Sequence, residues 1–205
     1  MERPQDYETL TTLDISNKGL TELPSWVSQC HNLKELNCFN NKITKIQNLQ
    51  PTLEILVCSR NKITYLDNLP QTLIELDCSN NQLEHLDNLP ITLETLGCSG
   101  NKITQIDNLP LTLKQLDCSY NQITQLDNLP ITLETLRCSS NKITQLDNLP
   151  LTLKQLDCSY NQITKLDNLP ETVNSLLCTQ NPFKYEFEPT LENIKNYNNQ
   201  NKLPK

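Results

Sequence analysis

The sequence predicts a repeat solenoid, in which one small structural unit is stacked many times along a single axis. Two observations carry this prediction. The segment LDNLP recurs at 66–70, 86–90, 126–130, 146–150 and 166–170, with IDNLP at 106–110, always in steps of twenty residues. Eight of the nine cysteines keep the same period: Cys38, Cys58, Cys78, Cys98, Cys118, Cys138, Cys158 and Cys178. A fixed period of this length indicates units that bury a continuous core between neighbours.

Residues 1–32 are expected to form an N-terminal cap with a longer first repeat, which runs from Leu10 to the start of the next repeat at Leu33. It contains the segment LPSWVSQC. A helical turn there would place Trp26 and Val27 over the open end of the core. The end of a solenoid requires such a cover.

Residues 33–182 are expected to form tandem twenty-residue repeats. The L-x-x-L-x-C stretch of each repeat alternates apolar and polar residues, which predicts a short strand. Because every repeat returns the chain to the same place, the strands must be parallel, in one sheet of about nine strands. The proline of each DNLP segment predicts extended or 3-10 return legs and excludes a long helix there.

Two polar positions recur beside the predicted strands. An asparagine three residues after each periodic cysteine can satisfy backbone groups where the chain leaves the strand. A threonine just before each strand from Thr72 to Thr172 forms a second ladder. The asparagines are Asn41, Asn61, Asn81, Asn101, Asn121, Asn141, Asn161 and Asn181.

Residues 183–205 are expected to form a C-terminal cap and tail. The segment TLENIK predicts a helix that closes the last repeat. The tail from about Asn198 to Lys205 is expected to be frayed. The apolar residues of this cap are Phe183, Tyr185, Phe187, Leu191 and Ile194.

The aligned unit L-x-x-L-x-C-S-x-N-x-I-T-x-L-D-N-L-P-x-T resembles the leucine-rich repeat family over residues 10–183. Its L-P-x-T-L-x-x-L start and twenty-residue length are similar to the short subtype of bacterial effector proteins. The Cys-Ser pair, the many asparagines and the DNLP linkers are similar to leucine-rich repeat proteins of giant amoeba-infecting viruses. The resemblance implies a curved array with its strands on the concave side, used to bind proteins.

Composition excludes several classes of function. The net charge is −7 and the 17 basic residues are scattered, so we expect no nucleic-acid binding. No apolar run is long enough to span a membrane, and the start MERPQDYETL is no signal peptide. We therefore expect a monomer in the cytoplasm, or in the host cytoplasm if the protein is viral or an effector.

The cysteines and histidines predict neither a metal centre nor catalysis. One cysteine per repeat makes a straight file of small apolar side chains, whereas zinc needs ligands that converge in pairs such as C-x-x-C. Only Cys30 lies outside the file, and it is the expected exception to burial. His31 and His85 lie several repeats apart, and the three glycines form no phosphate loop. We expect no enzyme activity and no cofactor.

A file of six aspartates in the DNLP segments has two interpretations. It could attract Ca²⁺, which favours several carboxylate oxygens. Alternatively, each aspartate is solvated or bonds an adjacent amide. The aspartates are Asp67, Asp87, Asp107, Asp127, Asp147 and Asp167.

The concave side carries two columns whose residues vary while the core positions hardly change. One column precedes each cysteine and the other lies two residues beyond it. Such variation on a fixed frame is typical of a binding surface, although exposed positions also drift without function. Tyr120, Arg137 and Tyr160 are candidate partner contacts, and Arg137 could instead pair with its aspartate neighbours. The candidate partner-binding residues are Asp77, Asp117, Tyr120, Arg137, Asp157 and Tyr160.

The sequence therefore predicts a non-catalytic protein-interaction module that binds a protein on its concave face. Three alternatives stay open: an effector that redirects a host process, a structural spacer without a dedicated ligand, and a cation-binding solenoid.

Overall fold

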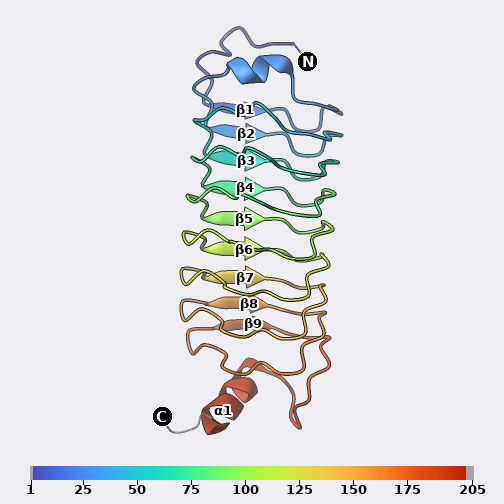
Figure 1. Cartoon of the computed structure of the whole chain (residues 1–205), viewed down its shortest axis with the longest axis vertical. Coiled ribbons are helices and arrows are strands. Elements are labelled where there is room, and N and C mark those ends of the chain that lie inside the picture. The colour runs from blue at the N-terminus through green and yellow to red at the C-terminus, as the bar shows by residue number, and fades with distance from the viewer. Residues whose placement is uncertain (1, 202–205) are drawn as a thin grey trace.

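The chain forms an elongated stack of short turns, with the two ends of the chain at opposite ends of the stack (Figure 1). The computed structural model describes residues 2–201. Nine strands in this range pair in chain order into one sheet. The strands are β1 (Thr12–Asp14), β2 (Glu35–Asn37), β3 (Ile55–Val57), β4 (Glu75–Asp77), β5 (Thr95–Gly97), β6 (Gln115–Asp117), β7 (Thr135–Arg137), β8 (Gln155–Asp157) and β9 (Ser175–Leu177). The predicted solenoid of twenty-residue repeats is confirmed.

All eight strand pairs are parallel, and residues at the same repeat position face one another, as Leu36 faces Leu56. Each strand is three residues long and ends before the periodic cysteine, so it is shorter than the L-x-x-L-x-C pattern suggests. The inter-repeat hydrogen bonds nevertheless continue, because the Cys38 amide donates to the Val57 carbonyl at 2.8 Å. In-register stacking turns every repeat position into a column of side chains.

The core consists of such columns, filled mainly by leucine, isoleucine and cysteine. In the second repeat, Leu33, Leu36, Cys38 and Ile43 are each at most 1% exposed. The core is therefore a narrow strip that runs the length of the stack, and each repeat adds one layer. Burial of apolar surface between layers is the main stabilising contribution.

The predicted asparagine ladder is confirmed, and Asn81 illustrates it. Its Nδ2 donates to the carbonyls of Cys58 and Cys78, each at 3.0 Å, and to the Ser79 carbonyl at 3.2 Å. Its Oδ1 accepts the amide proton of Ile63 at 3.0 Å. The side chain thus satisfies backbone groups of two repeats where the chain leaves the sheet.

The predicted threonine ladder is also confirmed. The hydroxyl of Thr92 lies 2.7 Å from the Leu73 carbonyl and 2.9 Å from the Gln71 carbonyl of the preceding repeat. The carbonyl of Pro90, two residues before Thr92, accepts a hydrogen bond from the Leu93 amide at 3.1 Å and so closes the turn into the strand. Threonine and proline together fix where each repeat begins.

A 3-10 helix, η1 (Ser25–Gln29), covers the first repeat, as predicted. Trp26 and Val27 are 7% and 3% exposed. The prediction that Cys30 escapes burial is wrong, because this thiol is 0% exposed and lies 3.7 Å from the Trp26 carbonyl oxygen. The helical turn folds the chain back over Cys30.

The other end is covered by helix α1 (Leu191–Asn201), which the sequence predicted as a closing helix. Ile194 is 0% exposed, and Nδ2 of the buried Asn198 donates to the Leu166 carbonyl at 2.9 Å. The prediction of fraying from Asn198 is therefore wrong for residues 198–201, which continue the helix. Residues 202–205 lie outside the described residues.

Burial shifts the pKa values of the cysteine file. Burial raises the pKa of Cys38 to about 12. It raises the pKa of Cys58, Cys98 and Cys138 well above the ordinary value of 9.0. The folded chain therefore keeps these thiols protonated and unreactive, since the thiolate is the nucleophile.

We expect the free energy of unfolding to fall as pH rises above about 9. Below this pH the thiols are protonated in both states and contribute no pH dependence. Above it, the unfolded chain releases protons that the folded chain still holds, so alkali favours unfolding. The slope is at most about 1.4 kcal/mol per pH unit for each buried thiol. Urea unfolding between about pH 7.5 and pH 10.5 would measure it.

Cys118→Ala is the matched control for this experiment. It should lower the free energy of unfolding at every pH through the cavity it leaves. It should also reduce the fall of the unfolding free energy with pH, above about pH 9, by the contribution of one thiol. A native chain whose stability is flat up to about pH 10.5 would contradict the burial of ionisable thiols.

Candidate protein-binding face

The candidate site lies on the outward side of the sheet, called the sheet face. It comprises the strand residues that point away from the core and the turn that follows each strand. The strand register places Asp117 beside Arg137 and Arg137 beside Asp157. Asp77 lies two repeats before Asp117, with Gly97 between them. Four of the six candidate residues therefore share one column.

The three aspartates of this column have a local structural role that the sequence analysis did not assign. Oδ1 of Asp77, Asp117 and Asp157 accepts the amide proton of the serine two residues further on, at 3.0, 3.0 and 3.1 Å. These are Asx turns, which fix the exit from the strand. Each carboxylate keeps one oxygen outside this bond, and in Asp77 that oxygen accepts the Ser59 hydroxyl at 2.6 Å.

Arg137 is exposed at the end of β7. The sequence left open that it pairs with Asp117 and Asp157. Among the ion pairs formed within residues 2–201, none joins Arg137 to either aspartate. Its guanidinium group thus remains available on the sheet face, with five donors in a planar fork that suits a carboxylate.

Tyr120 and Tyr160 are exposed, at 67% and 59%, but for a different reason from the one the sequence suggested. The period-two strand was expected to continue through them. Instead the strand ends earlier, and both residues adopt the left-handed conformation, with φ of 53° and 54°. The exposure of the two rings is therefore set by the turn after the strand rather than by strand alternation.

Left-handed backbone is unfavourable for a bulky side chain and is tolerated best by glycine and asparagine. The same column in the other repeats holds Asn17, Asn40, Arg60, Asn80, Gly100, Ser140 and Gln180. Asparagine and glycine occupy four of these seven positions, so the fold has residues that suit the turn. The fold imposes this left-handed turn on every repeat, but it does not require tyrosine there.

The repeat before that of Tyr120 has no side chains at the two variable positions of the sheet face. Gly97 and Gly100 occupy both variable columns there. A Cβ built at Gly97 would lie 3.2 Å from Asp77 Oδ1, and one built at Gly100 would lie 2.7 Å from Asn80 Oδ1. Side chains of the preceding repeat therefore lie close to these glycines, and Tyr120 occupies the position of Gly100 in the following repeat.

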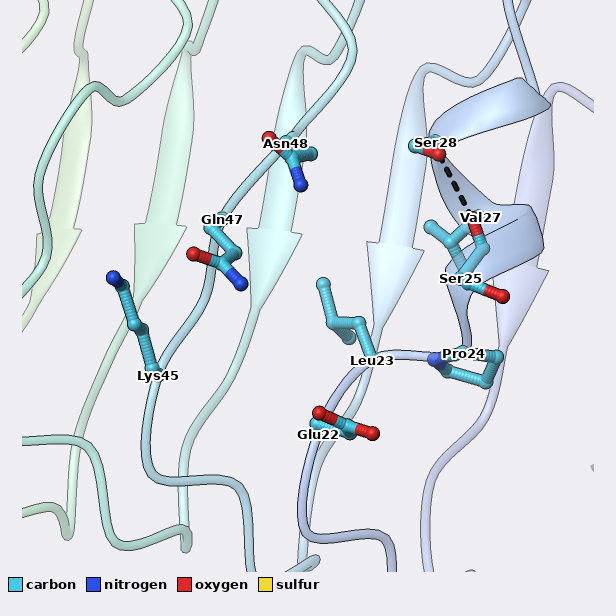
Figure 2. Close-up of a pocket in the computed structure, with 9 residues that line it drawn as sticks. All are labelled: Glu22, Leu23, Pro24, Ser25, Val27, Ser28, Lys45, Gln47 and Asn48. Carbon is cyan, nitrogen blue, oxygen red and sulfur yellow. Dashed lines mark hydrogen bonds between the residues drawn. The ribbon is translucent and has the colours of Figure 1, made fainter.

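Several hollows lie elsewhere among residues 2–201. One, of about 340 Å³, lies on the sheet face over β1–β3 and includes Ile55 and Val57 in its lining. Another, of about 310 Å³, lies between η1 and the return leg of the next repeat, and its lining includes Glu22, Ser28 and Gln47 (Figure 2). Ser28 Oγ donates to the Ser25 carbonyl at 2.8 Å, so this hydroxyl serves the helix. Neither lining contains a histidine or a cysteine.

The DNLP segments have a conformational role that sequence reasoning missed. Their asparagines are left-handed, with φ between 53° and 61°: Asn68, Asn88, Asn108, Asn128, Asn148 and Asn168. The preceding aspartates are exposed, and Asp107 and Asp127 accept bonds from Gln105 and Gln125, both at 2.9 Å. Within residues 2–201, no three Cys, His, Asp or Glu side chains converge as a metal site would require.

A family model described as leucine-rich repeats (2 copies) matches residues 8–51. Among solved structures, YopM, a leucine-rich effector protein from Yersinia pestis, is 35% identical with a TM-score of 0.79, covering 83% of this chain and 48% of YopM. The functional domain of InlJ from Listeria monocytogenes, which includes a cysteine ladder, is 32% identical with a TM-score of 0.69, covering 92% and 48%. A Shigella effector leucine-rich repeat domain is 25% identical with a TM-score of 0.63, covering 92% and 74%.

The chain is therefore a leucine-rich repeat protein, similar in structure to the repeat domains of bacterial effectors. It spans about half the length of YopM and of the InlJ domain. No curated protein sequence matches it. The similarity to proteins of giant viruses stays a prediction. Leucine-rich repeat domains are typically non-catalytic modules that bind proteins. No helix within residues 2–201 has the length and apolar character of a membrane span.

Proposed function

We propose that the chain is a non-catalytic module whose protein partner docks on the sheet face over β6–β8, centred on Tyr120, Arg137 and Tyr160. The observation that carries the proposal is the pair of exposed tyrosines in left-handed backbone. Strained residues cluster at functional sites, and the chain places asparagine or glycine at four of the seven other equivalent turns. Tyrosine and arginine are also the residues most enriched at the centres of protein interfaces.

The geometry supports a division of roles. Tyr120 and Tyr160 lie two repeats apart, about 10 Å at the spacing of parallel strands, with Ser140 between them. Two rings at this distance can clasp one segment of a partner. Arg137 lies in the neighbouring column and can bind a carboxylate with two parallel hydrogen bonds. Asp77, Asp117 and Asp157 give the same face a negative rim that favours a partner with basic residues.

An effector role is the second candidate, favoured by the similarity to the Yersinia and Shigella effector domains. It would place the module in the cytoplasm of a host cell. The reduced, buried cysteine file suits such a reducing compartment. The expected monomer also belongs to this proposal.

Affinity capture from a cytosolic extract of candidate host cells, with mass spectrometry, tests the module. The decisive variant is Tyr120→Asn, Arg137→Asn, Tyr160→Asn, because asparagine occupies the equivalent positions of the second repeat as Asn40 and Asn37. We expect it to weaken capture of the main partner at least tenfold, or about 1.4 kcal/mol. Its free energy of unfolding should stay equal or rise by about 1 kcal/mol, since the strain at two turns is relieved.

The matched control is Gln125→Ala with Gln145→Ala on the return legs, which should leave capture unchanged. A folded triple variant with full capture would contradict the proposed centre. The hollow over β1–β3 would then be tested with Val57→Asn. Recovery of no specific protein by the native chain would favour the spacer interpretation.

A further inference from the structure

Four large aliphatic side chains form an exposed column at the turns that precede β5–β8. They are Ile91, Leu111, Ile131 and Leu151, and 74%, 75%, 77% and 80% of each is exposed. We call them the aliphatic column. Each stands between the proline of a DNLP segment and the threonine of the ladder. The column lies at the start of the strands, away from the tyrosine turns at their ends.

The fold does not require apolar residues at this position. The equivalent residues of the flanking repeats are Gln71 and Glu171, which are polar and exposed. An apolar side chain exposed in four successive repeats and in neither neighbour makes a bounded stripe. Stripes of this kind on a water-soluble surface mark binding sites.

The column is also held rigid. The backbone carbonyl of each member accepts the threonine hydroxyl of the next repeat, at 2.8 Å for Ile91 and Leu111 and 2.7 Å for Ile131. The same bond, at 2.8 Å, holds Leu151. A partner that binds these side chains therefore meets a surface whose backbone is already ordered, which lowers the entropic cost of binding.

We propose that the aliphatic column binds an amphipathic α-helix of a partner protein, which lies along the axis of the stack with basic residues along one flank. The column residues repeat once per layer, about 4.8 Å apart. A helix presents one apolar side chain per turn of about 5.4 Å, in the i, i+4, i+7, i+11 pattern. Over four side chains the two spacings differ by only about 2 Å in total.

An extended strand matches the column poorly. Its side chains on one face repeat about every 6.7 Å, so over four side chains it would fall out of step by more than one layer. A helix of about three turns covers the whole column and keeps each of its apolar residues near a layer. The spacing thus selects the helix.

The charges beside the aliphatic column indicate which residues the bound helix carries along its flank. Four residues before each column member stands an exposed aspartate of a DNLP segment: Asp87, Asp107, Asp127 and Asp147. On the strand side the charges are already paired, since Lys114 binds Glu94 at 2.8 Å and Lys154 binds Glu134 at 2.7 Å. The uncompensated charge beside the column is negative, so lysine or arginine along one flank of the helix complements it.

The same charges disfavour a second copy of this chain as the occupant. A second copy would bring its own file of aspartates beside its own column and no free row of positive charge. The whole chain carries a net charge of −7, which adds to the repulsion. The helix of a basic partner meets both the spacing and the charge.

The test uses a synthetic peptide of about 18 residues, with leucines in the i, i+4, i+7, i+11 pattern and lysines along one flank. Fluorescence anisotropy measures its binding to the native chain. We expect the variant Ile91→Gln, Leu111→Gln, Ile131→Gln, Leu151→Gln to bind at least tenfold more weakly. It should fold normally, since glutamine already occupies the equivalent position as Gln71. Circular dichroism checks this.

Two controls complete the design. A peptide with glutamate in place of lysine should bind at least tenfold more weakly than the basic peptide. The sheet-face variant with asparagine at 120, 137 and 160 should bind the basic peptide as the native chain does, which separates this proposal from the proposed function. Equal binding of native and glutamine variants, or no preference for the basic peptide, would overturn it. So would a native dimer that the glutamine variant abolishes, because the column would then bind a second copy.

Discussion

Replacement of Asn81 by leucine is expected to destabilise the chain by about 3–5 kcal/mol, although the two side chains are similar in volume. The amide of Asn81 bonds three backbone carbonyls and one backbone amide, and it is 9% exposed. Leucine would leave these groups without their partner in a place that water does not reach. Each buried group left unpaired costs about 1–3 kcal/mol, and two or three of the four are expected to stay unpaired.

The neighbouring Asn80 provides the matched control. It is the left-handed residue of the same repeat, with φ of 54°, and Asn80→Gly keeps a conformation that glycine adopts freely. This variant should change the free energy of unfolding by less than about 1 kcal/mol. Urea titration of both variants measures the difference. Similar, small losses for the two asparagines would mean that the ladder contributes little.

The fold was predictable because one period controls everything in it. Once the chain returns every twenty residues, strand pairing, register and the asparagine ladder follow from stacking alone. Leu36, Cys38 and Asn41 could be assigned without knowing a single contact. Stacking no longer determines the structure where the repeats stop. Cys30 and Asn198 were misjudged because the burial of a cap residue depends on how η1 or α1 folds back, which no period describes.

Backbone conformation was the second feature that limited prediction from the sequence. A period-two pattern places Tyr120 on a strand, whereas the structure places it in a left-handed turn. The signal was present in the same column, as Asn40, Asn80 and Gly100, which are residue types that favour positive φ. The exposed tyrosines were found for the wrong reason, and the strain that makes them informative could only be seen in the structure. Whether they bind a partner stays a prediction.

The aliphatic column was missed although its residues are plain in the sequence. Ile91 and Leu111 sit inside a segment rich in buried leucines, such as Leu89 and Leu93. Apolar residues two apart in a narrow solenoid all look like core. Only the turn closed by the threonine hydroxyl decides which of them points to solvent. Hydropathy alone does not distinguish these exposed residues from the buried leucines beside them. The solvent exposure of each side chain in the structure does.

Removal of residues from Phe183 onward is expected to cause aggregation or cooperative loss of structure. The removed segment covers the last layers with a cluster of four rings, in which Tyr185 lies 4.7 Å from Phe187 and 5.2 Å from Tyr197 between centroids. It also accepts the Leu166 amide proton at Tyr185 Oη, at 2.7 Å. Without it, the core and the edge of β9 would be open to other chains.

A point variant separates loss of the cover from loss of chain length. Ile194 is 0% exposed on the inner side of α1, and Ile194→Asp would bury a charge there. We expect it to lower the free energy of unfolding by about 3 kcal/mol or more and to promote association in gel filtration. Asn196→Ala, on the exposed side of the same helix, should be neutral or slightly stabilising, because alanine favours helix.

A truncated chain that stays monomeric and melts like the native protein would show that α1 is dispensable, and β9 would then have to tolerate an open edge by itself. That tolerance would be unusual, since Leu176 at the centre of β9 is only partly buried even with α1 in place. The expected outcome is therefore that the helix is as necessary to the solenoid as the repeats it covers.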